Sequence, residues 1–366
     1  MKTKTPISSK NTTNFLGEVI KLGLDVHMEK YVVVMKIDGS APVRAKSFTP
    51  EAFLSWVKDL QGRCNQLFTC YEAGPFGYSL HRKLESMNIV NYVIRPVNWD
   101  EHGKRIKTDG RDATQMALCL DGYLKGNTRS FSVVRVPTEH EERERSVTRQ
   151  RESLCKERRR LAAKARGYVV YYGGRLKGEW WKARRWEQLE EHLNEHLIAL
   201  LRPLRTIILV IEEQIANGEK RMAQMPAPAL PRGMGTVVFQ QMEKEVCDWN
   251  RFKTRRQVAG YTGLCPCEDT SANRRFQGSI TKHGNPRLRH MLVECVWLLL
   301  QWNSDYRGIL KWRDQLLEAK LTKASKKKIV VAIARQFCVD WWRLRTGKIT
   351  AEQLGLSMKE VARLTA

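Results

Sequence analysis

The sequence predicts a mixed α/β domain, then a long basic helical arm, then a mostly α-helical C-terminal domain. Three observations lead to this division: strand-like and helix-like patterns alternate over the first 130 residues, apolar residues recur every seven positions further on, and a proline-rich joint, Met225–Pro231, follows. A chain of 366 residues is long enough for two or three domains. We expect a flexible N-terminus at 1–15, the α/β domain at 16–130, the arm at 131–224 and the last domain at 225–366.

The composition indicates a polyanionic partner. Lysine and arginine number 64 against 39 acidic residues, which gives a formal net charge of +25 and a pI near 9.9. Such an excess favours nucleic acid. We expect no membrane partner, because the best apolar stretch, Leu197–Ile211, is short and interrupted by charges and by Pro203. Nine irregularly spaced cysteines and a polar N-terminus predict reduced thiols in a bacterial cytoplasmic protein.

The α/β domain is predicted from alternating apolar patterns. Three strand-like segments come first: EVIKLGLDVH, EKYVVVMKIDG and PVRAKSFTP. The elements that follow are a helix at Pro50–Leu60, a strand ending at Glu72, a helix at Tyr78–Met87, a strand stopped by Pro96, and a helix after Lys107. Three strands followed by helix, strand, helix, strand and helix is the element order of a ribonuclease-H-like fold.

Four carboxylates fall at the ends of these elements. Asp25 ends the first strand and Glu72 ends the fourth. Asp109 and Asp112 open the last helix, where a spacing of three residues places both on one face, so that together they can hold a hard divalent cation. The alternative is that these acids only suit the N-terminal dipole of a solvated helix. Because Asp25 and Glu72 also lie at the ends of strands, the four carboxylates together predict a two-metal site that cleaves phosphodiesters.

The arm is predicted from charge and periodicity. Between Arg143 and Arg166 the chain has ten basic and three acidic residues, among them the run Arg158, Arg159 and Arg160. Apolar residues recur every seven positions, which indicates one long helix; they are Val147, Leu154, Leu161 and Tyr168. A second helix starts near Trp186, and Pro203 is expected to kink or end it. We expect a helical hairpin or a dimerisation arm with a basic face, against the alternative of a solvated helix.

The last domain is predicted to be helical apart from one functional loop. Gly233 and Gly235 precede a helix and leave backbone N–H groups open for a phosphate, although a simple glycine turn is the alternative. The segment Gly260–Asn285 is expected to be a long basic loop that carries Ser271. The five tryptophans of the following helices are expected to fill the core rather than stack on bases; they are Trp297, Trp302, Trp312, Trp341 and Trp342.

Two groups of segments, one in each end domain, occur in the order and spacing of a known family. The first group is LGLDVH, YEAGPFGYSLHRKL, VIRP and KTDGRDA, and the second is RGMG, RFKTRRQVAGYTGLCP and ITKHGNPRLRHML. On these segments the chain resembles the DEDD-motif insertion-sequence transposases, the group that includes Piv-like invertases and bridge-RNA-guided recombinases. The resemblance extends from Lys21 to the last helices.

The resemblance implies a RuvC-like domain with a metal site and a separate nucleophile. The four acids that it assigns to Mg²⁺, in up to two ions and with Mn²⁺ as a substitute, are Asp25, Glu72, Asp109 and Asp112. It implies that Ser271 attacks a DNA phosphate and forms a phosphoserine bond. The family has a Ser-Ser-Gly stretch where this chain has Thr270, Ser271 and Ala272, so Thr270 is a rival hydroxyl. Since the serine and the acids lie in different domains, the complete site must form by domain docking or between protomers.

The function that the resemblance implies is cutting and rejoining of donor and target DNA by a homodimer or homotetramer, guided by a bridge-type RNA. The residues expected to contact nucleic acid are Lys107, Arg111, Arg158, Arg159, Arg160, Gly233, Gly235, Arg274, Arg275, Lys282, Arg287 and Arg289. Two other interpretations stay open. One is a RuvC-like metal-dependent nuclease or junction resolvase that uses water, and the other is a basic structural protein that binds nucleic acid without catalysis.

Overall fold

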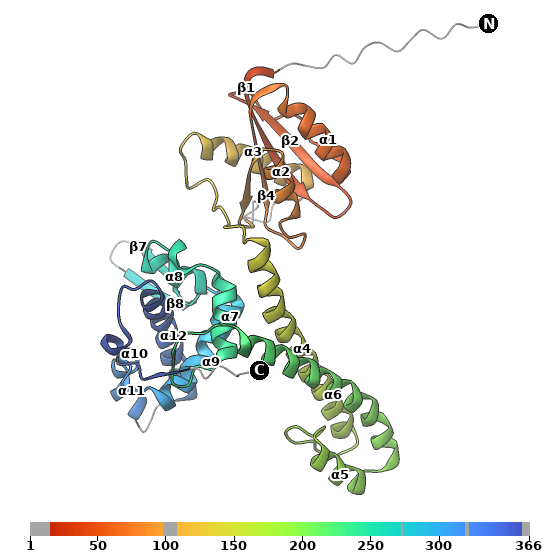
Figure 1. The fold of residues 1–366 in the computed structure, drawn as a ribbon, viewed down its shortest axis with the longest axis vertical. Coiled ribbons are helices and arrows are strands. Elements are labelled where there is room, and N and C mark those ends of the chain that lie inside the picture. Colours follow the sequence, from red (N-terminus) through yellow and green to blue (C-terminus); the bar gives the residue numbers. More distant parts are fainter. Residues whose placement is uncertain (1–14, 98–107, 272–273, 319–321, 361–366) are drawn as a thin grey trace, which may run out of the picture. The chain divides into compact units, whose positions relative to one another are not determined.

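The structure, a computed structural model, describes residues 15–97, 108–271, 274–318 and 322–360. The chain divides into two compact units, Met1–Val136 and Pro137–Ala366, whose folds are drawn in Figure 1. The predicted tail at 1–15 lies outside the described residues except for Phe15, which begins the first strand. The other predicted boundaries, at 130/131 and 224/225, stay predictions. In the described part of the chain, every helix is too short or too polar to cross a membrane.

The first unit is a five-stranded mixed sheet with helices on both faces (Figure 1). Its elements are β1 (Phe15–Val26), β2 (Tyr31–Ile37), β3 (Lys46–Phe48), α1 (Pro50–Gln61), β4 (Cys64–Glu72), α2 (Ser79–Ser86), β5 (Val90–Ile94) and α3 (Asp109–Leu124). The strands lie in the order β3-β2-β1-β4-β5. β1 is antiparallel to β2 and parallel to β4, and β4 is parallel to β5. The predicted order of elements is confirmed.

The two faces of β1 bury different kinds of side chain, because successive residues of a strand point to opposite sides. Ile20, Leu22 and Leu24 are fully buried in a core shared with α1 and α2. The alternate residues therefore face α3. At Gly23 an added Cβ would lie 2.2 Å from the carbonyl oxygen of Ala113, so the missing side chain is what lets α3 lie this close to the strand.

An ionic cluster fills the same face of the sheet at the C-terminal end of α3. Lys21 and Lys36 are paired residues of β1 and β2, and both are buried. The Asp121 carboxylate of α3 lies 3.3 Å from the Lys21 amine, 3.4 Å from the Lys36 amine and 2.8 Å from the Lys125 amine. Burial opposes ionisation of Asp121, but hydrogen bonds from Lys125 and Lys21 and the charge of Lys36 hold its pKa below the ordinary value.

The arm is an antiparallel helical hairpin made by α4 (Glu139–Tyr171) and α6 (Glu195–Gln224), with α5 (Ala183–His192) between them (Figure 1). The ion pairs Arg151–Glu219 and Arg158–Glu212 are seven residues apart on both helices, which sets an antiparallel register. The buried residues also recur every seven positions. They are Thr148, Cys155, Ala162 and Val169 on α4, and Leu201, Ile208, Ile215 and Met222 on α6.

The structure corrects the predicted buried row of α4 and excludes one of the two outcomes predicted at Pro203. The buried row of α4 lies one residue after the predicted one, apart from Leu161, because it consists mostly of small side chains that let the larger residues of α6 approach. The helix also does not end at Pro203. Leu201 and Ile208 are fully buried on either side of the proline. Burying each side chain contributes about 1.5–3 kcal/mol of stabilisation, which offsets the backbone hydrogen bond lost at Pro203. The break occurs earlier, where Asn194 caps α6.

The last part of the second unit is mostly helical around one large core. Its elements are β6 (Leu230–Pro231), α7 (Thr236–Val246), η1 (Trp249–Arg251), α8 (Arg255–Thr262), β7 (Pro266–Ser271), β8 (Arg274–Ile280), α9 (Pro286–Trp302), α10 (Arg307–Leu310), α11 (Arg313–Leu317), α12 (Lys323–Arg345), α13 (Ala351–Leu354) and β9 (Met358–Lys359). The predicted long loop at Gly260–Asn285 is wrong. β7 and β8 form an antiparallel hairpin, whose backbone hydrogen bonds order a segment with a loop-like composition.

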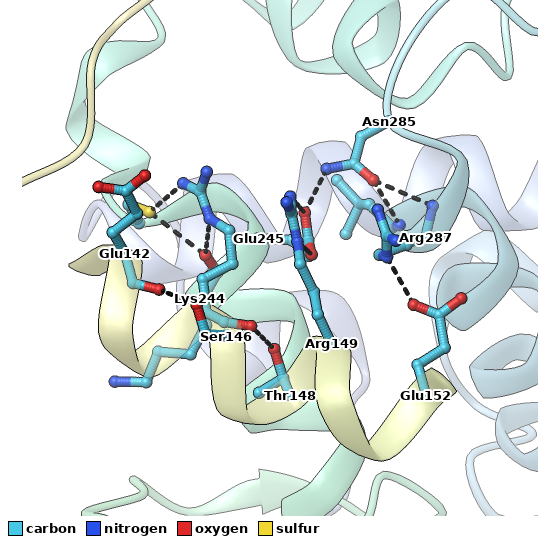
Figure 2. Close-up of polar contacts among 12 residues, drawn as sticks. Glu142, Ser146, Thr148, Arg149, Glu152, Lys244, Glu245, Asn285 and Arg287 are labelled. Carbon is cyan, nitrogen blue, oxygen red and sulfur yellow. Dashed lines mark hydrogen bonds and ion pairs between the residues drawn. The ribbon is translucent and has the colours of Figure 1, made fainter. Parts of the chain in front are cut away.

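A polar interface joins α4 to α7 and to the start of α9 within the second unit (Figure 2). The Arg149 guanidinium donates to both carboxylate oxygens of Glu245, at 2.8 and 3.0 Å, and the Asn285 amide donates to the same carboxylate at 2.8 Å. Glu245 is almost fully buried. Burial opposes its ionisation, but Arg149 and Asn285 hold its pKa below the ordinary value. The base of the arm is therefore held by a hydrogen-bonded charge pair.

Candidate active site

The end of β1 and the start of α3 bring together a group of metal-ligand side chains. Asp25, His27 and Asp109 offer ligand atoms that all lie within 4.8 Å of one another. The His27 Nε2 atom is 3.3 Å from Asp25 Oδ2 and 3.8 Å from Asp109 Oδ2. Asp25 and Asp109 are 84 positions apart in the sequence, so the fold, rather than local structure, creates this cluster.

The geometry of β1 explains why these groups meet. Asp25 lies two residues after Gly23 and therefore points to the same face of the sheet, toward α3. The close approach of α3 at Gly23 places its first turn, with Asp109 and Asp112, beside the end of the strand. Both acids also lie where the helix dipole favours negative charge.

The carboxylates of the cluster lie close enough to influence one another's ionisation. Burial raises the pKa of Asp25 above its ordinary value, His27 opposes this effect, and the negative charges of Asp109 and Asp112 add to the rise. Lys30 places its amine 3.3 Å from Asp109 Oδ2. Carboxylates crowded in this way fit a hard divalent cation, since oxygen ligands with uncompensated charge are those that Mg²⁺ or Mn²⁺ prefers.

Glu72 lies at the same edge of the sheet but outside this group. It ends β4, and the neighbouring pair Leu24–Tyr71 sets the parallel register that places Glu72 next to Asp25 along the sheet edge. Its carboxylate accepts a hydrogen bond of 3.3 Å from the backbone N–H of Val97. Glu72 and Asp112 are not among the described side chains whose ligand atoms lie within 4.8 Å of one another. Their assignment as ligands stays a prediction.

His27 and Lys30 are two side chains at the site that sequence reasoning missed. His27 follows Asp25 at the spacing of two that keeps strand residues on one face, so the motif LGLDVH already contained this signal. Lys30 begins the return into β2 and reaches Asp109 across the turn. Nothing in the sequence around Lys30 links it to a residue 79 positions away.

Ser271, the predicted nucleophile, is the last residue of β7. It pairs with Arg274, the first residue of β8, and Thr270 pairs with Arg275. The predicted nucleophile, its rival hydroxyl and two predicted nucleic-acid contacts thus lie at the end of one two-stranded hairpin. Their chemical roles stay predictions.

Four of the predicted nucleic-acid contacts in the arm and last domain have ion-pair or hydrogen-bond partners within the protein. Arg158 is paired with Glu212 at 3.0 Å, and Arg287 is paired with Glu152, as Figure 2 shows, so these guanidinium groups have protein partners. Arg160 pairs with Glu157, and Arg159 donates to a backbone carbonyl of its own helix.

The other predicted contacts lie near turns of the backbone. Gly233 has a φ of +91°, and an added Cβ would lie 3.0 Å from the Leu298 carbonyl oxygen, which gives it a packing role. Gly235 caps α7 without a side-chain hydrogen bond. Arg289 donates to the carbonyl oxygens of Thr262 and Lys282. Arg111 lies in the first turn of α3, and Lys107 lies outside the described residues.

Comparisons with known proteins agree on one family. The sequence profile of the transposase IS116/IS110/IS902 family matches residues 231–310. The candidate transposase y4qE of Sinorhizobium fredii is 32% identical over 314 residues, which cover 79% of this chain and 77% of that protein. The transposase for insertion sequence element IS1111A of Coxiella burnetii is 22% identical over 93% of both chains. The transposase for insertion sequence element IS1533 of Leptospira borgpetersenii is 23% identical over 76% of this chain and 84% of that protein.

The profile match includes the β7–β8 hairpin, and the similarity to y4qE extends over more than three quarters of both chains. On these grounds the chain belongs to the IS116/IS110/IS902 family of insertion-sequence transposases.

Proposed function

We propose that this protein transposes DNA by cutting and rejoining phosphodiester bonds, with a divalent metal ion in the first unit and a serine nucleophile in the second. The relatives named above are transposases of insertion sequences, and this supports DNA as the substrate. The net charge of +25 supports a polyanionic partner. The single observation that carries the proposal is the meeting of Asp25, His27 and Asp109 at the sheet edge.

The first unit is proposed to be a ribonuclease-H-like nuclease domain. The sheet order β3-β2-β1-β4-β5, with β1 antiparallel to β2 and parallel to β4, supports this assignment. In such a domain the acids at the ends of β1 and β4 and at the start of the last helix converge. Asp25, Glu72 and Asp109 hold these positions here.

Each side chain has a separate task in the proposed mechanism. Asp25, Glu72, Asp109 and Asp112 would hold Mg²⁺ or Mn²⁺. When bound, this ion supplies the positive charge that stabilises a phosphate during displacement. The amine of Lys30 and the ring of His27 would hold the carboxylates of Asp109 and Asp25 in position. The Ser271 hydroxyl gives up its proton as its oxygen forms a bond to phosphorus. The bond from phosphorus to the leaving strand's oxygen breaks, that oxygen takes up a proton, and the resulting phosphoserine retains the energy for rejoining.

The metal site is tested by neutralising one acid without changing its shape. We expect Asp109→Asn to lower DNA cleavage by roughly 10³-fold, since several kcal/mol of transition-state stabilisation would be lost. The matched control is Glu51→Gln, an exposed acid of α1 outside the cluster, which should cleave at the wild-type rate. DNA nicking with Mg²⁺ measures the difference. Equal activity of Asp109→Asn and the control would rule out the metal site.

The nucleophile is tested by trapping the covalent intermediate on labelled DNA in denaturing gels. Ser271→Ala should abolish the protein–DNA adduct, and Thr270→Ala should retain it. The reverse pattern would assign the nucleophile to Thr270. Cleavage that persists in both variants without any adduct would instead support the metal-dependent nuclease that uses water.

We also propose a bridge-type RNA as the guide and a homodimer or homotetramer as the active assembly. The strongly basic composition supports a second polyanion, and base pairing to an RNA would supply the sequence choice. Sequencing of the RNA that co-purifies with the protein tests this part. One dominant RNA species is expected, and a random mixture of cellular RNA would contradict it.

A further inference from the structure

A cavity of about 410 Å³ lies in the last part of the second unit, between α8, α10 and α12. Its lining residues include none of the acid cluster, the β7–β8 hairpin or the predicted nucleic-acid contacts. The side chains that give it its character are five cations and one aromatic ring. They are Arg255, Arg256, Lys311, Trp312, Arg335 and Arg343.

Most of the cations of this cavity have no acidic partner among the described residues. No acidic residue is among its lining groups. In the part of the chain that the structure describes, Arg255, Arg256 and Arg335 have no carboxylate within ion-pair distance, and the printed contact of Lys311 is with the ring of Trp312. The arginines of the arm behave differently, because Arg158 and others have acidic partners. Four unpaired cations around one hollow repel each other, and a bound anion would remove this repulsion.

Arg343, which lines the cavity, does have an acidic partner, Asp340, and other hydrogen bonds hold this carboxylate in position. Asp340 is fully buried and accepts from Arg307 at 2.6 Å and from the Tyr306 hydroxyl at 2.9 Å. Arg343 lies 3.6 Å from the same carboxylate. Because two guanidinium groups share one carboxylate, the Arg343 side of the cavity also carries excess positive charge.

The position of Arg255 and Arg256 strengthens the field. They occupy the first turn of α8, where the helix dipole already places partial positive charge and where acids are normally preferred. Two cations at this end of the helix are unfavourable for the helix itself. The same arrangement attracts an anion, since the helix dipole and the two guanidinium groups act together.

Trp312 gives the cavity a second kind of surface. The ring is half-buried against the core and lines the cavity, with the Lys311 amine 6.0 Å from its centroid. An aromatic face beside a cluster of cations is the combination that binds an unpaired nucleotide, because the cations contact the phosphate and the ring stacks on the base. The volume is that of a small-ligand pocket, which suits one nucleotide rather than a double helix.

We infer that this cavity binds one unpaired nucleotide of a nucleic-acid strand, with its phosphate among the arginines and its base against Trp312. The inference rests on the proposed function only in taking the polyanion to be nucleic acid. The chemistry fits single-stranded DNA and RNA alike, and the experiment separates them.

The test compares two double variants with the same loss of charge. Arg256→Gln/Arg335→Gln removes two cations of the cavity, and Arg313→Gln/Lys323→Gln removes two exposed cations of α11 and α12 that do not line it. Binding of full-length protein to labelled single-stranded DNA, to RNA of the same sequence and to duplex DNA is measured by fluorescence anisotropy in EDTA. A thermal melt confirms that each variant is folded.

We expect the cavity variant to weaken binding of one single-stranded probe by about tenfold or more. The salt slope, which is the slope of log affinity against log salt concentration, should fall in magnitude by about 1.4 for two lost phosphate contacts. The control should change affinity by less than about threefold. Trp312→Ala should also weaken this probe about tenfold while leaving the salt slope unchanged, and Trp312→Phe should retain most of the affinity. The probe with the larger loss identifies DNA or RNA as the ligand.

Two results would overturn the inference. One is an equal loss in the cavity variant and the control on every probe, and the other is a loss confined to duplex DNA. Neither result depends on the proposed catalysis, because no cleavage occurs in EDTA. Conversely, failure of the Asp109→Asn test would leave a cavity-specific binding loss in place.

Discussion

The two ends of α3 both hold acids against β1, but they are built in opposite ways. At the C-terminal end a single buried carboxylate, Asp121, is surrounded by three lysine amines, and its pKa lies below the ordinary value. At the N-terminal end Asp25 lies near two further carboxylates, Asp109 and Asp112, and its pKa lies above the ordinary value. Burial raises the pKa of both acids; at Asp121 the lysines outweigh this effect, whereas at Asp25 the charges of Asp109 and Asp112 add to it and His27 opposes it.

The comparison separates an acid that is surrounded by cations from an acid that has other acids beside it. Asp121 has all its counter-charge within the protein, so its ionised form stabilises the folded state. Asp25 has the negative charges of Asp109 and Asp112 beside it, and burial and these charges make its ionised form less favourable in the folded state than in the unfolded state.

The largest effect is expected from removing the counter-charge of the buried lysines. Asp121→Asn should lower the free energy of unfolding by about 3–5 kcal/mol, because Lys21 and Lys36 then stay buried with too little negative charge. Urea unfolding measures this loss. The control is Asp59→Asn, which removes an exposed partner of Arg63 and should cost less than about 1 kcal/mol. Similar values for both variants would show that the lysine cluster is not a stabilising device.

A smaller loss is expected from Gly23→Ala. The new methyl group would meet the backbone of α3 at Ala113 and Ala117, neither of which can rotate away, so we expect a cost of about 1–3 kcal/mol. Displacement of α3 should also weaken metal binding, although no ligand is changed. Gly39→Ala, at a turn with open space around it, is the control. Unchanged stability and unchanged Mg²⁺ affinity in Gly23→Ala would contradict the close packing of α3 on β1.

The comparison is sharpened by adding the cation. Mg²⁺ at about 100 times its dissociation constant should stabilise the wild-type protein by about 2.7 kcal/mol. In Asp25→Asn this gain should be lost, while the protein without Mg²⁺ should be at least as stable as the wild type, because Asp25 no longer ionises against its neighbours. Thermal melts with Mg²⁺ and with EDTA measure both quantities. Equal stabilisation of the two proteins by Mg²⁺ would place the ion elsewhere.

The smallest expected effect is a difference in the sign of two pH dependences. The pKa of Asp25 is raised in the folded state, so its contribution to stability falls as the pH rises from about 4 through the folded pKa. The pKa of Asp121 is lowered, so its contribution is complete above about pH 4 and is lost as the pH falls through the folded pKa. Urea titrations of wild type, Asp25→Asn and Asp121→Asn between about pH 3 and 6 measure the two slopes. Slopes of the same sign would refute the contrast between the two ends of α3.

The sequence predicts the first unit well because its signals are local. Alternating apolar residues predict β1 and β2, and proline predicts the start of α1. The acids of the cluster lie at the ends of predicted elements, so their positions were predicted with them. His27 was within reach of the same reasoning, since a spacing of two on a strand means a shared face. Lys30 was not, because its contact with Asp109 depends on how α3 is placed over the sheet.

The second unit is less predictable because tertiary contacts decide its details. The β7–β8 hairpin has a loop-like composition, and its strands are defined by pairing rather than by apolar alternation. Trp341 and Trp342 fill the core as predicted, but Trp302 is 56% exposed and Trp312 lines the cationic cavity. The cavity draws its side chains from segments up to 88 residues apart, so neither its charge nor its ring has a local signature.

The seven-residue repeat shared by α4 and α6 has a consequence for the size of the molecule. Small side chains on one helix face large ones on the other at every step, so each heptad is an equivalent building block. Deleting one heptad from both helices would shorten the hairpin by about 10 Å and restore the same seam. A hairpin shortened in this way should therefore keep its antiparallel pairing, provided that the contacts at its base and tip are left unchanged.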